Sequence, residues 1–182
     1  MIEPVRCRAL AAGRQGRRTD AEKESGMKIR NPKHNDDWKT PQSFYDALNA
    51  EFQFQFDPCP YRHSMEWDGL TIDWSGRNFV NPPYSRKLKE AFVRKAIEES
   101  KKGKLCVVLL PVYTSTALFH DWIKPYATEI RFVRARVLFE GFNMRGEHVD
   151  ANTGSRPQHD SMLVIFDGRE SKPRAATDGG AL

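Results

Sequence analysis

The stretch with the clearest chemical content is NFVNPPYS, residues 78–85, in which a short apolar run ends in Asn81-Pro82-Pro83-Tyr84. Two consecutive prolines fix two backbone φ angles and remove two N–H donors, so the carbonyl of Pro82 can point outward from a stiff turn. With the side-chain oxygen of Asn81, this carbonyl makes a pair of acceptors that suits an amine carrying two N–H groups. The ring of Tyr84 can stack on a base that has left its helix.

The exocyclic amine of adenine is a substrate that needs such a pair of acceptors. Its lone pair is delocalised into the ring, and gripping both hydrogens favours a tetrahedral nitrogen and stabilises positive charge as it develops. The same four residues also occur as an ordinary turn, so the interpretation depends on the elements around them.

Those elements alternate between helix and strand. Apolar residues spaced by four predict a helix over 40–52, with Thr40 as N-cap and Pro41 at the first helical position. Alternating phenylalanines predict a strand over 52–56 that ends in a polar turn at Asp57. Further strands are predicted at 77–80, 105–111 and 161–168, an extended strand or bent pair at 129–141, and helices at 85–104 and 116–127.

This alternation predicts an α/β fold with an open, mostly parallel, doubly wound sheet in a single domain. In such sheets the ligand binds at the carboxyl ends of the strands, which is where Asp57 and Asn81 both fall. The expected organisation is a basic, disordered arm over 1–34, one domain over 35–168 and a flexible tail over 169–182.

Charge separates the arm from the rest of the 182 residues. Residues 1–34 contain nine Lys or Arg and four Asp or Glu, whereas residues 35–182 contain twenty of each. A polar, basic segment of this kind can attract a polyanion in a salt-dependent way. The alternative is that the segment is an extension upstream of a natural start at Met27.

Three cysteines fit neither a disulfide framework nor a four-ligand zinc site, and Cys59 with His63 forms only a fragment of one. We therefore predict no metal site, a structural or incidental role for Cys59, and a reducing compartment. No apolar run approaches the roughly 18 residues of a membrane span, and the first thirty residues lack a secretory signal, so a cytoplasmic protein is expected.

The tetrapeptide Asn81-Pro82-Pro83-Tyr84 resembles the catalytic motif of S-adenosylmethionine-dependent amino methyltransferases. The wider pattern is similar to the phage-type DNA N6-adenine methyltransferase (Dam) family, in the family's order and over roughly residues 36–168. The matching stretches are DWKTPQSFYDAL, FQFQFDPCP, DGLTIDWSGRNFVNPPYSR, VVLLPVYTSTALFHDWI, IRFVRARVLFEG and DSMLVIF. The resemblance implies a Rossmann-like class I methyltransferase fold and catalytic roles for Asn81, Pro82, Pro83 and Tyr84.

The implied cofactor is S-adenosyl-L-methionine. The sequence contains no G-x-G-x-x-G, which argues against a dinucleotide. By motif position, Asp57 is assigned to the methionine end of the cofactor and Asp73 to the adenosine portion, although either can be a helix cap. Thr40 and Pro41 are placed at the cofactor's edge, and Asp68 is a weaker candidate. The turn DPCPYRH departs from the glycine-rich turn that is usual in this fold.

The implied partner is double-stranded DNA with its target adenine flipped out. Arg86 and Lys87 directly follow the motif and are placed to contact phosphates beside the flipped nucleotide, unless they only form a solvated helix face. The long polar loop over 140–160 is expected to approach the DNA and influence target choice. Its candidate contacts are Arg145, His148 and Arg156.

Two alternatives stay open at this level. Cytosine N4 and a protein glutamine amide also present an amine with two hydrogens, although the stretches LLPVYTSTALFHDWI and RVLFEG favour adenine. A non-catalytic DNA-binding relic of the fold is the other alternative. Neither the recognition sequence nor the choice between strict and relaxed specificity can be predicted from these motifs.

Overall fold

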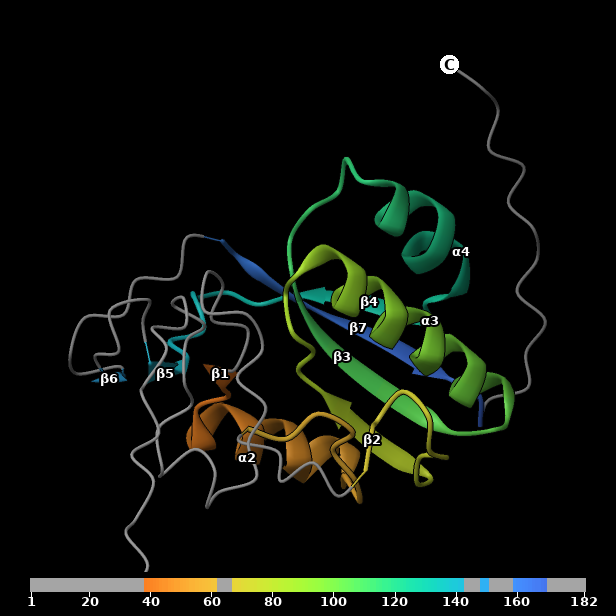
Figure 1. The fold of residues 1–182 in the computed structure, drawn as a ribbon, viewed down its shortest axis with the longest axis horizontal. Coiled ribbons are helices and arrows are strands. Elements are labelled where there is room, and N and C mark those ends of the chain that lie inside the picture. The colour runs from red at the N-terminus through yellow and green to blue at the C-terminus, as the bar shows by residue number, and fades with distance from the viewer. Residues whose placement is uncertain (1–37, 62–66, 143–147, 151–158, 170–182) are drawn as a thin grey trace, which may run out of the picture.

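The computed structural model describes residues 38–61, 67–142, 148–150 and 159–169. Its strands are β1 (Trp38–Lys39), β2 (Arg77–Val80), β3 (Leu105–Pro111), β4 (Glu129–Phe132), β5 (Glu140–Phe142), β6 (His148–Val149) and β7 (Ser161–Asp167). Its helices are α2 (Gln42–Phe52), α3 (Arg86–Lys101), the π-helix η1 (Leu118–Ile123) and α4 (Lys124–Tyr126). Figure 1 shows their arrangement.

The strands form two sheets. The main sheet has the order β2-β3-β7-β4, and a small sheet has the order β1-β5-β6. In the main sheet β2 and β3 are parallel, with Val80 opposite Val108, whereas β7 runs antiparallel to both β3 and β4. The described part of the chain is therefore a mixed α/β domain.

The antiparallel β7 differs from the predicted mostly parallel sheet. Two consecutive strands can be parallel only if a crossover, usually a helix, returns the chain to the end of the sheet at which the first strand began. Between β4 and β7 the described residues form the short strands β5 and β6 and no helix. The start of β7 lies beside the end of β4, where Val133 N–H donates to the Ser161 carbonyl at 2.9 Å. The chain thus enters β7 at the same end of the sheet at which it left β4, so the two strands are antiparallel.

Helices and loops cover both faces of the main sheet. On one face, α3 and η1 enclose a core around Val80, Phe92 and Val108. Figure 1 shows α3 crossing in front of β3 and β7, with α2 below. On the other face, α2 supplies Leu48 and Phe52 to a second core. All seven residues of β3 are buried, as its continuous apolar run predicts.

Helix α2 explains why the predicted strand over 52–56 is wrong. Phe52 still belongs to the helix, and Gln53 ends it in the left-handed conformation with φ 54°. Only the last residues of the stretch can then pair with β2: Gln55 N–H donates to the Arg77 carbonyl, and Phe56 makes an isolated parallel bridge with Asn78. The segment keeps its direction alongside β2 without forming a full strand.

The remaining boundaries agree closely with the sequence-based elements. Strands β2, β3 and β7 and helix α3 lie where they were predicted, and the segment 129–141 divides into β4 and β5 in different sheets. The predicted short helix at 116–127 is a π-helical turn that continues into α4. In the described ranges, no helix is both long and apolar enough to cross a membrane.

Candidate functional site

A pocket of about 190 Å³ lies at the carboxyl end of β2. Four chain segments meet there: β1, the start of α2, the turn after Phe56 and the last residues of β2. The lining residues are Trp38, Lys39, Thr40, Gln42, Tyr45, Asp57, Cys59, Tyr61, Phe79 and Asn81. The pocket thus combines four aromatic rings with a carboxylate and a small number of polar groups, a composition typical of small-molecule sites.

Asp57 is the acidic group of this pocket. Its Oδ1 accepts a hydrogen bond from the backbone N–H of Cys59 at 2.9 Å. Burial raises the pKa of Asp57 to about 7, and the hydrogen bond from the backbone N–H of Cys59 only partly opposes that rise. Among the described residues, no basic side chain pairs with this carboxylate. A half-buried carboxylate without a basic partner is suited to bind a cationic ligand.

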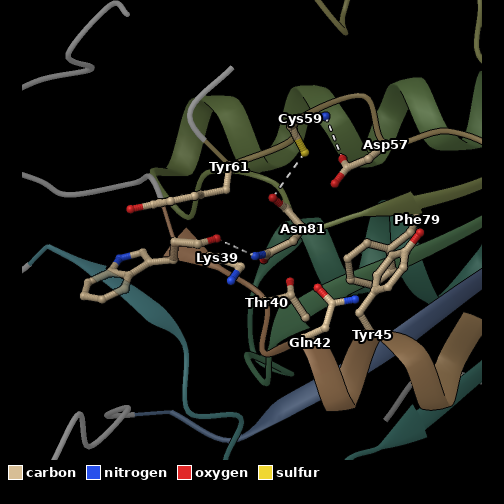
Figure 2. A pocket seen from close by; sticks show the side chains of 10 residues that line it. Lys39, Thr40, Gln42, Tyr45, Asp57, Cys59, Tyr61, Phe79 and Asn81 are labelled. Carbon is tan, nitrogen blue, oxygen red and sulfur yellow. Dashed lines mark hydrogen bonds between the residues drawn. The ribbon is translucent and has the colours of Figure 1, made fainter. Parts of the chain in front are cut away.

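Asn81 enters the pocket directly after β2. Its side-chain Nδ2 donates to the Trp38 carbonyl at 3.0 Å, and its own backbone carbonyl accepts from the thiol of Cys59 at 3.1 Å. Figure 2 shows both interactions, with Cys59 between Asp57 and Asn81. Because Nδ2 is engaged by β1, the orientation of the amide is fixed and Oδ1 remains as its acceptor.

The turn that carries Asp57 is held in place by a close contact with the loop 67–72. A Cβ on Gly69 would lie 1.9 Å from the carbonyl oxygen of Pro58, so only glycine allows this approach. The Gly69 carbonyl in turn accepts from the indole Nε1 of Trp74 at 2.7 Å, and Trp74 is buried in the core. The position of the turn is therefore set by core packing.

Helix α2 places the other side of the pocket. The predicted N-cap, Thr40, is not the cap: Pro41 occupies that position, and its carbonyl accepts from the backbone N–H groups of Phe44 and Tyr45. Pro41 fits there because its extended backbone precedes the first helical residue. Thr40 is consequently one residue outside the helix, and its side chain lines the pocket.

Tyr84 lies next to the pocket and is not part of its lining. Its ring packs edge-on against Phe139 with the ring centroids 6.0 Å apart. Its hydroxyl group is buried, and no described residue hydrogen-bonds to it. Burial, with smaller contributions from Cys59 and Tyr113, raises the pKa of this phenol far above its ordinary value. Pro82 and Pro83, which precede it, are both buried.

The structure does not bring Asp68 and Asp73 to the pocket. Asp68 caps a turn, accepting the Leu70 N–H on Oδ1 and the Thr71 N–H on its carbonyl. Asp73 precedes β2 at the strand's amino end, opposite Asn81, and its exposed carboxylate pairs with Lys102 at 2.6 Å. The Lys102 pairing, and not a helix N-terminus, is what lowers the pKa of Asp73.

The predicted DNA contacts are distributed over two surfaces. Arg86 and Lys87 are exposed in the first turn of α3, which contains no acidic residue. Cations are unfavourable at a helix N-terminus, so helix stability does not account for them. His148 is exposed on β6, with its ring edge-on to Phe142. Arg145 and Arg156 lie outside the described residues.

Several lining residues were not identified from the sequence. Trp38 and Lys39 belong to a two-residue strand, which is too short for any periodicity to indicate. Tyr45 could have been found, because it follows Pro41 by one helical turn and so lies on the same face of α2. Cys59 was predicted to have a structural or incidental role and was not placed in the pocket. Its position two residues after Asp57, in a turn with two prolines, was the available signal.

Comparison with known proteins shows the family of the chain. The family model described as DNA N-6-adenine-methyltransferase (Dam) matches residues 28–177. The chain is 30% identical over 154 residues to the DNA N-6-adenine-methyltransferase of Escherichia phage T1. That alignment covers 78% of this chain and 57% of the phage protein, so the chain spans just over half of its relative's length. No solved structure matches the chain significantly.

Proposed function

Because the chain belongs to the DNA N-6-adenine-methyltransferase (Dam) family, we propose that it transfers a methyl group from S-adenosyl-L-methionine to the exocyclic N6 amine of adenine in DNA. The observation that carries the proposal is the pocket at the end of β2, which joins the carboxylate of Asp57 to the motif asparagine, Asn81. The phage T1 relative is a DNA N-6-adenine-methyltransferase by name, which supports adenine as the acceptor.

The pocket's residues fit the cofactor. S-adenosylmethionine combines a cationic sulfonium and amino group with an apolar base and no phosphate. Asp57 would attract the cationic portion, since its carboxylate lacks a basic partner among the described residues. The rings of Tyr45 and Phe79 supply apolar surface for the base, and Thr40 supplies a hydroxyl at the edge, beside Pro41. When bound, the cofactor supplies a methyl group activated by the positive sulfur.

The motif residues act on the acceptor amine. We assign Asn81 Oδ1 and the carbonyl of Pro82 as the two acceptors of the N6 hydrogens. The contact of Asn81 Nδ2 with Trp38 supports this role, because an amide whose nitrogen is already engaged presents its oxygen without further reorganisation. After transfer the N6 nitrogen carries an extra proton, which it can release to water, so the site needs no dedicated base.

The target adenine must leave the duplex to reach this pocket. We assign Tyr84 to stacking on the flipped base. Its buried hydroxyl has no partner among the described residues, which makes the observed position of the ring less favourable than one in which the hydroxyl is satisfied. Movement of the ring onto a base would relieve that penalty.

We propose that Arg86 and Lys87 contact DNA phosphates beside the flipped nucleotide. Both side chains are exposed, and they follow the motif directly. His148, Arg145 and Arg156 remain candidates for contacts that choose the target, with His148 exposed on the small sheet. The substrate is then double-stranded DNA, with strict or relaxed site preference.

The rest of the chain is assigned in the same proposal. The order β2-β3-β7-β4 with helices on both faces is consistent with a Rossmann-like class I methyltransferase fold over residues 35–168. We assign residues 1–34 as a basic arm that strengthens DNA binding, and 169–182 as a tail. Removing residues 1–26 should weaken DNA binding and lower its salt dependence while leaving the chemistry in place. We assign the protein to the cytoplasm of a bacterial or phage-infected cell, where it would meet such DNA.

Transfer of a labelled methyl group tests the proposal. The protein is incubated with S-adenosylmethionine labelled on its methyl group and with double-stranded DNA, single-stranded DNA, RNA or protein in separate reactions. We expect label in DNA, and at least a hundredfold less with the Asn81→Ala variant, because that change removes one of the two acceptors. Label in protein alone would overturn the DNA assignment. Intact cofactor binding without transfer to any acceptor would favour the relic.

A further inference from the structure

The turn Asp57-Pro58-Cys59-Pro60 brings one residue, Cys59, into contact with both polar groups of the pocket. Its backbone N–H donates to Asp57 Oδ1 at 2.9 Å, and its thiol donates to the backbone carbonyl of Asn81 at 3.1 Å. Figure 2 shows these two interactions as dashed lines on either side of Cys59. Pro58 and Pro60 have no N–H group, so Cys59 supplies the donors at this point of the turn.

Asn81 is held from two directions. The Trp38 carbonyl of β1 engages its side-chain nitrogen, and the thiol of Cys59 engages its main-chain oxygen. That oxygen belongs to the Asn81–Pro82 peptide plane, and a peptide plane moves as a unit. The contact with Cys59 therefore limits rotation of this peptide plane. The direction of the next carbonyl, that of Pro82, depends on the orientation of the plane. The contact with β1 holds only the side chain of Asn81, and the contact with Cys59 holds only its main chain, so both are needed to fix the whole residue.

We infer that Cys59 is a positioning residue, which holds the Asn81–Pro82 peptide in the orientation that methyl transfer requires and links it to the carboxylate of Asp57. The inference rests on the proposed function. Cys59 is half-buried and lines the pocket, whereas Cys106 is fully buried in β3 near Asn78, so the two thiols differ in role and in access.

The surroundings of Asp57 give the inference a second readout. Besides Cys59, the titratable groups around the pocket are Tyr45 from α2, Lys39 from β1 and Tyr61 from the turn. Lys39 is paired with Glu140 at 3.0 Å. The pKa of Tyr45 is raised by burial and, to a smaller extent, by the negative charge of Asp57. The backbone N–H of Cys59 donates to Asp57 and lowers the pKa of this carboxylate against the effect of burial. A side-chain substitution at Cys59 keeps this N–H, so the pKa of Asp57 should stay the same in such a variant.

The first test compares Cys59→Ala with Cys59→Ser. Serine keeps an O–H donor at this position, and alanine keeps none. We expect the alanine variant to slow single-turnover methyl transfer at saturating cofactor by about three- to tenfold, the effect of losing one modest hydrogen bond. Cofactor affinity at pH 8 should change by less than about twofold in the same variant. Serine should restore the rate to within about twofold of the wild type.

The second test follows cofactor affinity between pH 5.5 and 9. The pH at which affinity is half-maximal should be the same in the wild type, Cys59→Ala and Cys59→Ser, because all three keep the backbone N–H that donates to Asp57. A wild-type transfer rate in Cys59→Ala would overturn the inference. A slower rate that comes with a shifted midpoint would also overturn it, because the substitution would then act through Asp57 and not through Asn81. Weaker cofactor binding with an unchanged transfer rate would also overturn it, because Cys59 would then be only a wall of the pocket.

Reversible modification covers the case in which the alanine variant fails to fold. In a Cys7→Ser background, methyl methanethiosulfonate converts the accessible thiol of Cys59 to a methyl disulfide and removes its S–H donor, while Cys106 is protected by burial. Transfer should slow, and a reductant should restore it. Unchanged transfer after complete modification would contradict the inference. If the unmodified protein transfers no methyl group to any acceptor, the proposed function fails, an outcome distinct from transfer that is unaffected by modification of Cys59.

Discussion

Replacing Asp57 by asparagine separates the charge of this group from its shape. The amide oxygen of the new side chain can still accept the N–H of Cys59, which the carboxylate accepts at 2.9 Å. What the variant loses is the ability to ionise inside the pocket. Since burial raises the pKa of Asp57 from its ordinary 3.8 to about 7, the loss should be visible in both stability and cofactor binding, and each should depend on pH.

The sign of the stability effect follows from the raised pKa. Between pH 4 and 7 the unfolded chain has released this proton and the folded protein retains it, so stability falls as pH rises. Each pKa unit corresponds to about 1.4 kcal/mol. For Asp57 the penalty approaches about 4 kcal/mol at pH 8 and is below about 2 kcal/mol at pH 5. The asparagine side chain has no such penalty. The free energy of unfolding of Asp57→Asn, minus that of the wild type, should therefore increase by about 2–3 kcal/mol from pH 5 to pH 8.

The sign of the binding effect is opposite. A cationic ligand favours the ionised carboxylate, whose fraction rises from roughly a tenth at pH 6 to roughly nine tenths at pH 8 when the pKa is about 7. Cofactor affinity of the wild type, divided by that of Asp57→Asn, should therefore rise by close to tenfold over this range. Taking the ratio removes any titration of the ligand itself.

Urea denaturation at pH 5 and pH 8, and titration calorimetry with S-adenosylmethionine at pH 6 and pH 8, measure the two effects. The reasoning would be refuted by a stability difference between wild type and Asp57→Asn that is the same at both pH values. A constant ratio of affinities would likewise show that Asp57 does not face the cationic part of the cofactor. A stabilised variant that has lost affinity would identify Asp57 as a group kept for binding at the expense of stability.

Three other substitutions test neighbouring parts of the account. Tyr84→Phe removes a buried hydroxyl without a partner among the described residues, and urea denaturation should show a gain of about 1 kcal/mol or more; a loss would mean that the hydroxyl is satisfied. Arg86→Ala should lower the slope of log K for DNA against log salt by about 0.9, whereas Lys124→Ala on α4, an equal charge change, should leave it unaltered. Gly69→Ala would place a Cβ 1.9 Å from the Pro58 carbonyl, and should destabilise the protein by about 1–3 kcal/mol and weaken cofactor binding; normal binding would contradict the role of this contact.

The sequence was sufficient to place Asn81, because two strong local signals coincide there. A short apolar run predicts β2, and two consecutive prolines end the strand. Asn81 lies between the apolar run and the first proline, so it must be at the strand's carboxyl end. Helix α3 and strand β3 were predictable for the same reason: helical spacing in one and a fully apolar run in the other reflect burial that the structure confirms.

The pocket's other walls could not be predicted from local patterns. Strand β1 has two residues and exists only because Trp38 and Lys39 pair with Gly141 and Glu140, about a hundred positions along the chain. The direction of β7 depends on where the chain between β4 and β7 travels, which no periodicity encodes. Asp73 resembled a strand-end ligand, and only the positions of Lys102 and β2 show that it lies at the opposite end of the strand.

The reaction itself is tested most directly by identifying the methylated base. Unmethylated double-stranded DNA is incubated with the protein and S-adenosylmethionine, digested to nucleosides and analysed by mass spectrometry, with Asn81→Ala in parallel. The account predicts N6-methyladenine from the wild type and essentially none from the variant. N4-methylcytosine would contradict adenine as the acceptor, and N6-methyladenine formed equally well by Asn81→Ala would contradict the catalytic role given to the pocket at the end of β2.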